Sequence, residues 1–366
     1  MHSYSDIQHF EVSAYEVPTD RPESDGTLEW DSTTLVLVEL KAGDTRGLGY
    51  TYSSPSCAVL IRDTLFPVIQ ANPTPWNIRA HWESMMNAVR NFGSSGIAAS
   101  AIAAVDMALW DLKARLLDVP LVQLLGQIRA AVPVYGSGGF TSYSINDLRD
   151  QLTGWVRNGF LRVKMKVGRE PQRDVERVAA AREAIGDAVE LFVDANGAYT
   201  RKEALAKAEQ FREVNVTWFE EPVDSDDLVG LRLIRDRAPG GMEITAGEYG
   251  YNAAYFRRML ESGSVDVLQP DATRCAGVTG FLQAAALCDS FMIPLSAHTA
   301  PSLHSHLCCA VPAARHVEYF HDHVRIERMF FDGAVQLVEG DVRPDPSRSG
   351  LGLEFKHADA EDFRIE

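Results

Sequence analysis

The sequence predicts an α/β protein in which a closed barrel of parallel strands follows a smaller α+β domain. Three observations lead to this prediction. Residues 127–344 contain eight short apolar runs, separated by amphipathic stretches in units of ~20–30 residues, which is the pattern of parallel strands joined by helices. Residues 1–126 instead place strand-like runs before helical ones. Ionisable side chains stand at the ends of consecutive runs, as at the C-terminal face of such a barrel.

The first domain is expected to begin with a meander of three strands, at residues 12–17, 33–40 and 47–52. Helical periodicity follows at residues 58–71, 78–91 and 95–117. Asp106 and Asp111 lie on the last helix, where we expect solvated or capping carboxylates. Between the first two strands, residues 18–30 are rich in Pro, Asp and Gly, which predicts a long polar loop, either a lid or a surface excursion.

The barrel strands are predicted at residues 132–137, 161–167, 190–194, 216–220, 243–246, 266–269, 293–296 and 317–320. Helical stretches lie between them, including residues 171–185, 201–214, 253–262 and 279–290. An open, doubly wound sheet is the main alternative. It is weakened because residues 136–139, GSGG, lack the dinucleotide-binding fingerprint and do not clearly open a helix.

The second predicted strand, LRVKMKVG at residues 161–168, carries two lysines on one face. Lys164 and Lys166 are two residues apart, so they project to the same side, while Met165 projects to the other. Two neighbouring lysines in an apolar strand are costly to bury without anionic partners. An isolated pair of this kind would simply reach into solvent, but here acidic residues follow at the later strand ends.

Ionisable residues stand at the end of every strand from the second to the eighth. After the lysines they are Asp194, Glu220, Glu248, Asp271, His298 and Glu318. One carboxylate at a strand end is usually a helix cap, but seven consecutive ends are not explained by capping. In a closed barrel these ends converge on one face, so we expect them to form a single site.

Three of these residues have the character of metal ligands. Asp194, Glu220 and Glu248 would repel one another unless a divalent cation held them, and oxygen-only ligation favours Mg²⁺ over zinc. Glu221 follows Glu220 directly and is expected to point away from the barrel interior and to play a supporting role. Asn196 shares the face of Asp194, and we expect it to contact substrate or metal-bound water.

The remaining residues suit proton transfer. Asp271 beside His298 would orient the imidazole and stabilise its protonated form, which predicts a catalytic dyad. Lys166 acts as a base only when neutral, and we expect the cations Lys164 and Mg²⁺ to lower its pKa. Glu318 is expected to be a protonated carboxylic acid that donates a hydrogen bond to a developing oxyanion.

Composition limits the partners and the compartment. The chain has 51 acidic and 35 basic residues, a net charge of −16, which argues against nucleic acid and anionic membranes. Its five cysteines lack C-x-x-C spacing and are expected to be reduced and buried. No signal peptide or membrane-spanning run is recognisable. We expect a cytoplasmic homo-oligomer that binds a small carboxylate substrate.

An ordered set of motifs resembles the mandelate racemase-like subgroup of the enolase superfamily. The motifs are KMK at 164–166, VDAN at 193–196, WFEEP at 218–222, AGE at 246–248, QPDATRCAGVTG at 269–280, SAH at 296–298 and HVE at 316–318. The helical stretch at 103–126 resembles the family's junction between its two domains. The resemblance implies a capping domain at 1–126, a modified (β/α)7β barrel at 127–344 and a tail, about 345–366, that returns to the cap.

The resemblance also implies roles for the site residues. Mg²⁺ would bind Asp194, Glu220 and Glu248. Lys166 and the His298–Asp271 dyad would act as bases on opposite faces of the substrate. Lys164 would meet the substrate carboxylate, and Glu318 would lie on the other side of the enolate formed when the α-proton leaves.

The reaction after the enolate stays open between two chemistries. Dehydration of a sugar acid to a 2-keto-3-deoxy acid follows if His298 protonates a departing hydroxyl, whereas a racemase or epimerase of a 2-hydroxy acid follows if it returns a proton to the same carbon. The polar stretch with Arg21 favours a hydroxyl-rich substrate, and Tyr50 and Tyr52 are expected at the same mouth. His321 and His323 either contact substrate or are solvated. A non-catalytic ligand-binding barrel is the third alternative.

Overall fold

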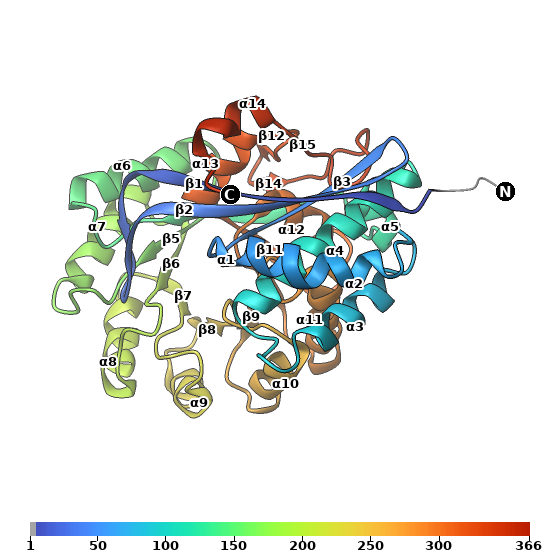
Figure 1. The fold of residues 1–366 in the computed structure, drawn as a ribbon. Helices are drawn as coiled ribbons and strands as arrows, with labels where there is room; N and C mark the ends of the chain where they lie inside the picture. The colour runs from blue at the N-terminus through green and yellow to red at the C-terminus, as the bar shows by residue number, and fades with distance from the viewer. Residues whose placement is uncertain (1–4) are drawn as a thin grey trace.

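The computed structural model describes residues 5–366 and begins with an antiparallel sheet. Its strands are β1 (Ile7–Ser24), β2 (Glu29–Ala42) and β3 (Thr45–Tyr52), arranged in that order. The β1–β2 hairpin is long, and Figure 1 shows it lying across the rest of the molecule. The predicted meander is therefore confirmed, but its first two strands are longer than expected.

Residues 18–30 form the far end of this hairpin, so the prediction of a long loop is wrong. Glu23 pairs with Trp30 and Ser24 with Glu29 across the ladder, after a register shift that begins at Pro18. Only the tip lies outside the strands, where the Asp25 carboxylate accepts the amide of Leu28 at 2.7 Å. The polar composition of this segment suggested a loop, but Glu23, Ser24 and Asp25 are buried by tertiary contacts that sequence periodicity does not report.

Short helices and one long helix cover this sheet. They are α1 (Ser56–Leu60), a π-helical turn at Ile61–Leu65, α2 (Phe66–Gln70), α3 (Ile78–Ala88) and α4 (Ile97–Leu116). The alanine-rich α4 is buried along most of its length, and small residues let β3 approach it closely. A Cβ on Gly49 would lie 2.5 Å from the amide nitrogen of Ala108, so only glycine fits there.

Eight parallel strands form the second part and close into a barrel. They are β4 (Val132–Gly138), β5 (Arg162–Lys166), β6 (Glu190–Asp194), β7 (Val216–Glu220), β8 (Glu243–Ala246), β9 (Val267–Leu268), β10 (Leu295–Ala297) and β11 (Ala314–Phe320). Each pairs with the next in chain order, and β11 pairs with β4. The predicted closed barrel is confirmed, and the open-sheet alternative is excluded.

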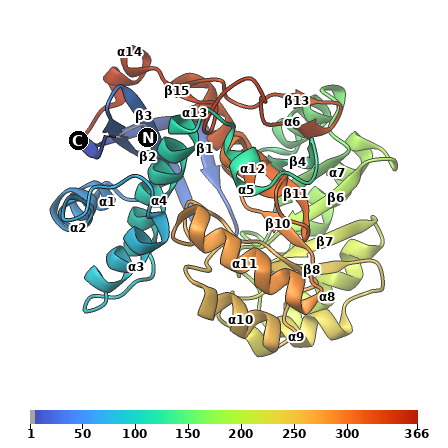
Figure 2. The same ribbon diagram turned by 90° about the vertical axis from the view of Figure 1, so that its right-hand side faces the viewer.

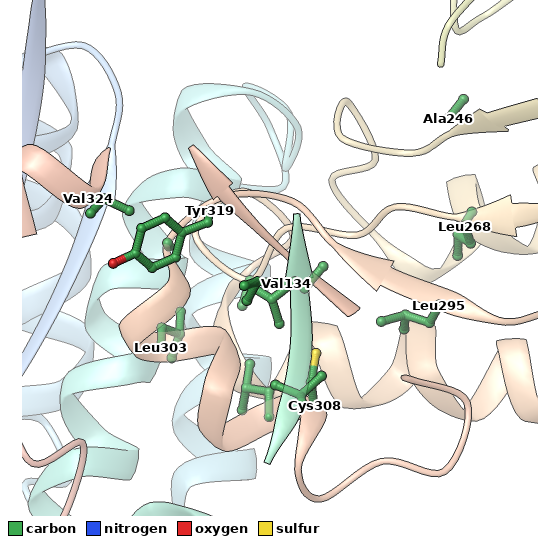
Figure 3. Packing of buried hydrophobic residues seen from close by; sticks show 14 of the residues in the cluster. Val134, Ala246, Leu268, Leu295, Leu303, Cys308, Tyr319 and Val324 are labelled. Carbon is green, nitrogen blue, oxygen red and sulfur yellow. The ribbon is translucent and has the colours of Figure 1, made fainter. Parts of the chain in front are cut away.

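Helices connect the barrel strands and surround them. They are α6 (Ile145–Arg157), α7 (Asp174–Ile185), α8 (Arg201–Arg212), α9 (Leu228–Arg237), α10 (Ala253–Glu261), α11 (Gly277–Phe291) and α12 (Pro301–Cys308). Figure 2 shows α3 and α4 to one side of the barrel, with α11 between them and the strands. The outward-facing side of the sheet packs on this shell, as Figure 3 shows for Val134 near Leu303 and Cys308 of α12.

Aromatic side chains fill the barrel interior below the strand ends. Phe192 stacks on Trp218 with ring centroids 4.9 Å apart, and Tyr135 meets both rings. His316 joins this layer and is kept neutral, because burial lowers its pKa well below the usual value. The polar groups at the strand ends therefore lie directly above a buried aromatic layer, where electrostatic interactions are strong because the local dielectric constant is low.

The C-terminal segment returns to the first sheet. After β11 come α13 (His321–Phe330), β12 (Phe331–Asp332), β13 (Leu337–Val338), β14 (Asp341–Val342), β15 (Glu354–Phe355), α14 (His357–Ala360) and a 3₁₀ turn at Glu361–Phe363. The amides of Ile365 and Glu366 then donate to the carbonyl oxygen of Ala14 on β1. All five cysteines are buried and free, as predicted. No helix within residues 5–366 is both long enough and apolar enough to cross a bilayer.

Asp106 and Asp111 join the two parts of the molecule; neither is solvated, and Asp106 confirms the other expectation, a capping carboxylate. Both are fully buried. Asp106 on α4 accepts the amide and the hydroxyl of Thr279, at 2.9 and 2.7 Å, and so caps the start of α11, whose preceding residue provides no side-chain cap. Asp111 accepts the amides of Leu48 on β3 and Leu351 in the C-terminal segment.

Replacing Asp106 with alanine should lower the free energy of unfolding by about 3 kcal/mol, because two buried donors of Thr279 lose their acceptor and the helix loses its cap. Urea unfolding followed by circular dichroism measures this loss. Asp150→Ala, at an exposed position of α6, is the matched control and should change stability by less than about 0.5 kcal/mol. Equal stabilities of the two variants would contradict the role of Asp106.

Candidate active site and metal centre

Three carboxylates converge at the ends of β6, β7 and β8. Asp194 and Glu220 end their strands and are fully buried, while Glu248 follows β8 and is 4% exposed. One oxygen from each residue lies within 4.8 Å of the others. The parallel register that pairs Asp194 with Glu220 places these side chains on the same level of the barrel. The three residues predicted as metal ligands are thus brought together.

Both lysines of β5 point into the barrel, and Met165 packs in the surrounding core, as the alternation of a strand predicts. Lys164 is fully buried and lies 2.6 Å from Glu220 and 2.8 Å from Glu318. Lys166 lies 2.5 Å from Asp194 and donates to the Asn196 side chain at 3.1 Å. The anionic partners required to bury this pair are therefore the carboxylates of the neighbouring strands.

His298 and Asp271 form the expected pair. The Nδ1 atom of His298 lies 2.9 Å from Asp271, and its Nε2 atom faces Glu248 at 3.2 Å. The amide and hydroxyl of Thr273 also donate to Asp271. These contacts fix the ring in one orientation, with Nε2 directed toward Glu248.

A cavity of about 380 Å³ lies between the barrel mouth and the first sheet. Barrel residues that border it are Lys166, Asn196, Glu248, Tyr249, Arg274, His298, Thr299, Phe320 and His323. The hairpin and its neighbours supply the opposite wall with Asp25, Leu28, Trp30, Ser32, Thr33, Thr34, Tyr52, Ser53 and Ser54. The cavity is therefore closed on one side by acid–base groups and on the other by a wall rich in hydroxyls.

Family models match both parts of the chain. Residues 10–126 match the mandelate racemase / muconate lactonizing enzyme N-terminal domain, and residues 147–360 match the enolase C-terminal domain-like model. The chain belongs to the mandelate racemase / muconate lactonizing enzyme family. This confirms the resemblance carried by the strand-end motifs.

Individual members of this family are similar over nearly the whole chain. A mandelate racemase/muconate lactonizing enzyme-like protein from Rubrobacter xylanophilus is 53% identical, with a TM-score of 0.96, and the match covers 98% of this chain and 100% of that one. The 3,6-anhydro-alpha-L-galactonate cycloisomerase of Streptomyces coelicolor is 32% identical over 96% of this chain and 98% of its own length.

A third relative contains a metal. The L-talarate/galactarate dehydratase of Salmonella typhimurium, with Mg and L-lyxarohydroxamate bound, is 26% identical with a TM-score of 0.90, and the match covers 100% of this chain and 94% of that one. The present chain is accordingly an enzyme of the family with Mg²⁺ as its cofactor. The alternative of a non-catalytic barrel is not supported.

The carboxylate cluster fits this cofactor. Its three donors are hard oxygen atoms, they are buried, and they lie within the reach of a single ion. Burial and the neighbouring Asp194 carboxylate together raise the pKa of Glu220 to about 7, as expected where carboxylates crowd together. Asp194, Glu220 and Glu248 are therefore the residues that would hold Mg²⁺.

Glu221 lies closer to these carboxylates than its place in a strand suggested. β7 ends at Glu220, and Glu221 has a left-handed backbone with φ of 38°, so strand alternation no longer applies. Its side chain is buried, and Oε1 has no hydrogen-bond partner within the described part of the chain. Burial raises its pKa well above the usual value, and Glu248 and Asp194 raise it further.

Two expected protonation states are corrected. Burial raises the pKa of Glu318, but Lys164 and His298 lower it by more, to about 2, so Glu318 is ionised and is not the expected acid. Burial and Lys164 lower the pKa of Lys166, as expected, but Asp194 outweighs both and raises it. The carboxylates around the lysines decide both outcomes, and sequence spacing does not give those distances.

His298 is held as a cation by its neighbours. Burial lowers its pKa, but Glu248, Glu318 and the hydrogen bond to Asp271 raise it to about 10. The hydrogen bond from His298 lowers the pKa of Asp271, against the effect of burial. The imidazolium therefore carries a proton on each nitrogen, with the Asp271 carboxylate behind Nδ1, and the proton on Nε2 suits a proton donor.

Two predicted substrate contacts lie outside the cavity. Arg21 is exposed and pairs with Asp147 on α6 at 2.6 Å. Tyr50 is fully buried and donates to Glu327 at 2.8 Å, between the sheet and α13. The hairpin is a paired ladder, so its residues alternate between its two faces, and only some of them turn toward the barrel.

Other residues border the cavity that the sequence left open or missed. His323 is only 8% exposed, and its ring stacks on Tyr52 with centroids 3.5 Å apart. Burial and the neighbouring His298 together lower the pKa of His323 to about 3, so its imidazole is neutral. Arg274 also borders the cavity and contacts Glu248 at 3.2 Å. The feature of the sequence that could have identified Arg274 is its position, a basic side chain just after the end of the sixth strand.

Replacing Gly26 with alanine should raise KM roughly tenfold while leaving the melting temperature nearly unchanged. Gly26 lies at the hairpin tip, where a Cβ would meet the carbonyl oxygen of Ala195 and lie 2.7 Å from that of Val167. The tip must then move away from the barrel mouth, and the cavity wall moves with it. Gly240→Ala, where nothing lies within 4 Å of the added Cβ, is the control and should behave as wild type.

Proposed function

We propose that this enzyme dehydrates a sugar acid to a 2-keto-3-deoxy acid. The proton α to the carboxylate leaves first, which gives an enolate. The hydroxyl on the β-carbon then takes a proton and departs as water. The enol that results tautomerises to the keto acid.

One observation carries this proposal: two proton-transfer groups border a cavity whose opposite wall is rich in hydroxyls. Lys166 on β5 and His298 after β10 are not neighbours around the barrel, so a substrate between them can offer its α-proton to one and its β-hydroxyl to the other. Hydroxyl side chains of the first domain would bind the remaining hydroxyls of a sugar acid: Ser32, Thr33, Thr34, Ser53 and Ser54.

In this proposal each site residue has one task. Lys166 removes the α-proton, and Asn196 positions its amine. His298, oriented by Asp271, protonates the departing hydroxyl. Lys164 binds the substrate carboxylate.

The remaining carboxylates organise charge. Glu318 orients Lys164 through their 2.8 Å contact. Asp194, Glu220 and Glu248 hold Mg²⁺. When bound, Mg²⁺ supplies the positive charge that stabilises the enolate oxygen and offsets the carboxylates that keep the proton on Lys166.

Racemisation or epimerisation of a 2-hydroxy acid is the second candidate. The presence of both Lys166 and His298 favours it, because a proton removed by one can be returned to the same carbon by the other. The substrate decides between the two outcomes, since only a β-hydroxyl can be eliminated. One relative is a 3,6-anhydro-alpha-L-galactonate cycloisomerase, and an isomerase among the relatives supports this second candidate.

Incubation of the Mg²⁺-loaded enzyme with a library of acid sugars in deuterated water should give a 2-keto-3-deoxy acid from at least one of them. A colorimetric assay for 2-keto acids detects the product, and mass spectrometry detects deuterium. A mandelate-type 2-hydroxy acid without a β-hydroxyl is the control substrate and should give no keto acid. Epimerised, deuterated acid with no keto acid from any substrate would favour the racemase instead.

A further inference from the structure

A second group of ligand-type side chains lies outside the active site, where the first domain meets the barrel. Asp20 and Glu23 come from β1, and His321 begins α13 after the last barrel strand. One donor atom from each lies within 4.8 Å of the other two. The Nε2 atom of His321 is 3.1 Å from Asp20.

Two carboxylate oxygens in this region are buried without a partner. Glu23 is fully buried, and Trp30 donates to its Oε2 at 2.9 Å, but its Oε1 has no hydrogen-bond partner among residues 5–366. Asp322 is also fully buried. Arg325 donates to its Oδ1, but its Oδ2 has no hydrogen-bond partner among residues 5–366. Buried oxygens of this kind are costly unless a proton or a cation meets them.

The charges near Glu23 leave an excess of negative charge. Asp20, Glu23 and Asp322 together bring three carboxylates, and Arg325 supplies one guanidinium. Burial and the nearby Asp322 carboxylate together raise the pKa of Glu23 to about 9, which agrees with this shortage of positive charge. A divalent cation would balance this excess and satisfy the free oxygen of Glu23.

We propose that Asp20, Glu23 and His321 bind a divalent transition-metal ion of the Zn²⁺ type. The imidazole nitrogen favours such an ion over Mg²⁺, which prefers oxygen ligands. Two ligands each about 2.1 Å from one tetrahedral ion lie about 3.4 Å apart, and Nε2 of His321 and the nearer oxygen of Asp20 are 3.1 Å apart. His321 also borders a cavity of about 740 Å³, which gives an ion access from solvent.

The bound ion would fasten the hairpin to the barrel. Two of its ligands lie on β1 and the third on the segment that follows β11, so the ion links the two parts of the molecule. The same hairpin supplies Asp25, Leu28 and Trp30 to the wall of the active-site cavity. Trp30 donates a hydrogen bond to Glu23, so an ion bound by Glu23 would hold that wall of the cavity in place.

Titration of the Mg²⁺-saturated enzyme with ZnCl₂ tests the proposal by calorimetry. Wild type should bind one further equivalent of Zn²⁺, and the metal should slow protease cleavage of the hairpin. Glu23→Gln, which keeps an acceptor for Trp30, and His321→Gln should each lose this binding. Asp20→Asn, at an exposed position, should weaken it at least about tenfold.

His9→Gln is the matched control, since His9 is exposed on the same strand next to Glu11 and outside the cluster. It should bind zinc as wild type does. Absence of saturable zinc binding in wild type would overturn the proposal and leave Glu23 as a protonated acid. Zinc binding that survives in all three cluster variants would also overturn it, because the ion would then sit elsewhere.

Discussion

Replacing Glu220 with glutamine should weaken Mg²⁺ binding by more than about a hundredfold and lower kcat by roughly a thousandfold. Glutamine keeps the volume of the side chain and an acceptor for Trp218, which donates to Glu220 at 3.0 Å. It removes one of three negative charges from the carboxylate cluster. The substitution should therefore weaken metal binding without disturbing the packing of the side chain. Calorimetric titration with MgCl₂ and steady-state kinetics on the best acid sugar measure the two effects.

Glu190→Gln is the matched control for this variant. Glu190 begins β6 at the opposite end of the barrel and pairs with Arg162 at 2.9 Å. Its replacement should leave both Mg²⁺ affinity and kcat within about twofold of wild type. Unchanged Mg²⁺ binding in the Glu220 variant would contradict the assignment. Glu221, whose buried Oε1 has no hydrogen-bond partner within residues 5–366, would be the next ligand to test.

Replacing His298 with asparagine should lower the rate of dehydration by about 10³-fold, because the departing hydroxyl loses its proton donor. A substrate that presents its α-proton to Lys166 should still exchange that proton with deuterated solvent. Lys166→Ala should show the opposite pattern and lose exchange and dehydration together. Proton NMR of recovered substrate follows exchange, and the keto-acid assay follows dehydration.

Two exposed positions provide controls for this pair of variants. His357→Asn on α14 and Lys202→Ala on α8 make the same chemical changes far from the cavity and should retain full activity. Loss of exchange together with turnover in the His298 variant would identify His298 as the abstracting base. The roles of the two residues would then be reversed, while the enolate chemistry would remain.

The barrel was predictable because each of its strands carries its own signal. A strand such as β6 has a short apolar centre and ends on an ionisable residue, Asp194, and the same pattern recurs around the barrel. Strand alternation then assigned Lys164 and Lys166 to the interior and Met165 to the exterior. These are local properties of the chain, so no knowledge of distant contacts was needed.

The hairpin and the buried carboxylates of α4 were not predictable in the same way. Residues 18–30 have the composition of a loop, yet they pair as strands because the barrel mouth buries Glu23 and Asp25. In the sequence Asp106 resembles a solvated helix residue, and only its contact with Thr279 of α11 shows its role. In both cases the deciding partner lies far away in sequence.

The barrel, the family and the order of the charged residues around the strand ends follow from the amino-acid sequence alone, because these depend on spacing along each strand. How those charges act on one another depends on the folded arrangement. It placed Lys164 between Glu220 and Glu318, which keeps Glu318 ionised, and it set Asp194 against Lys166, which raises the lysine pKa. Electrostatic effects depend on distance and burial, and neither quantity can be derived from the spacing of residues along the chain.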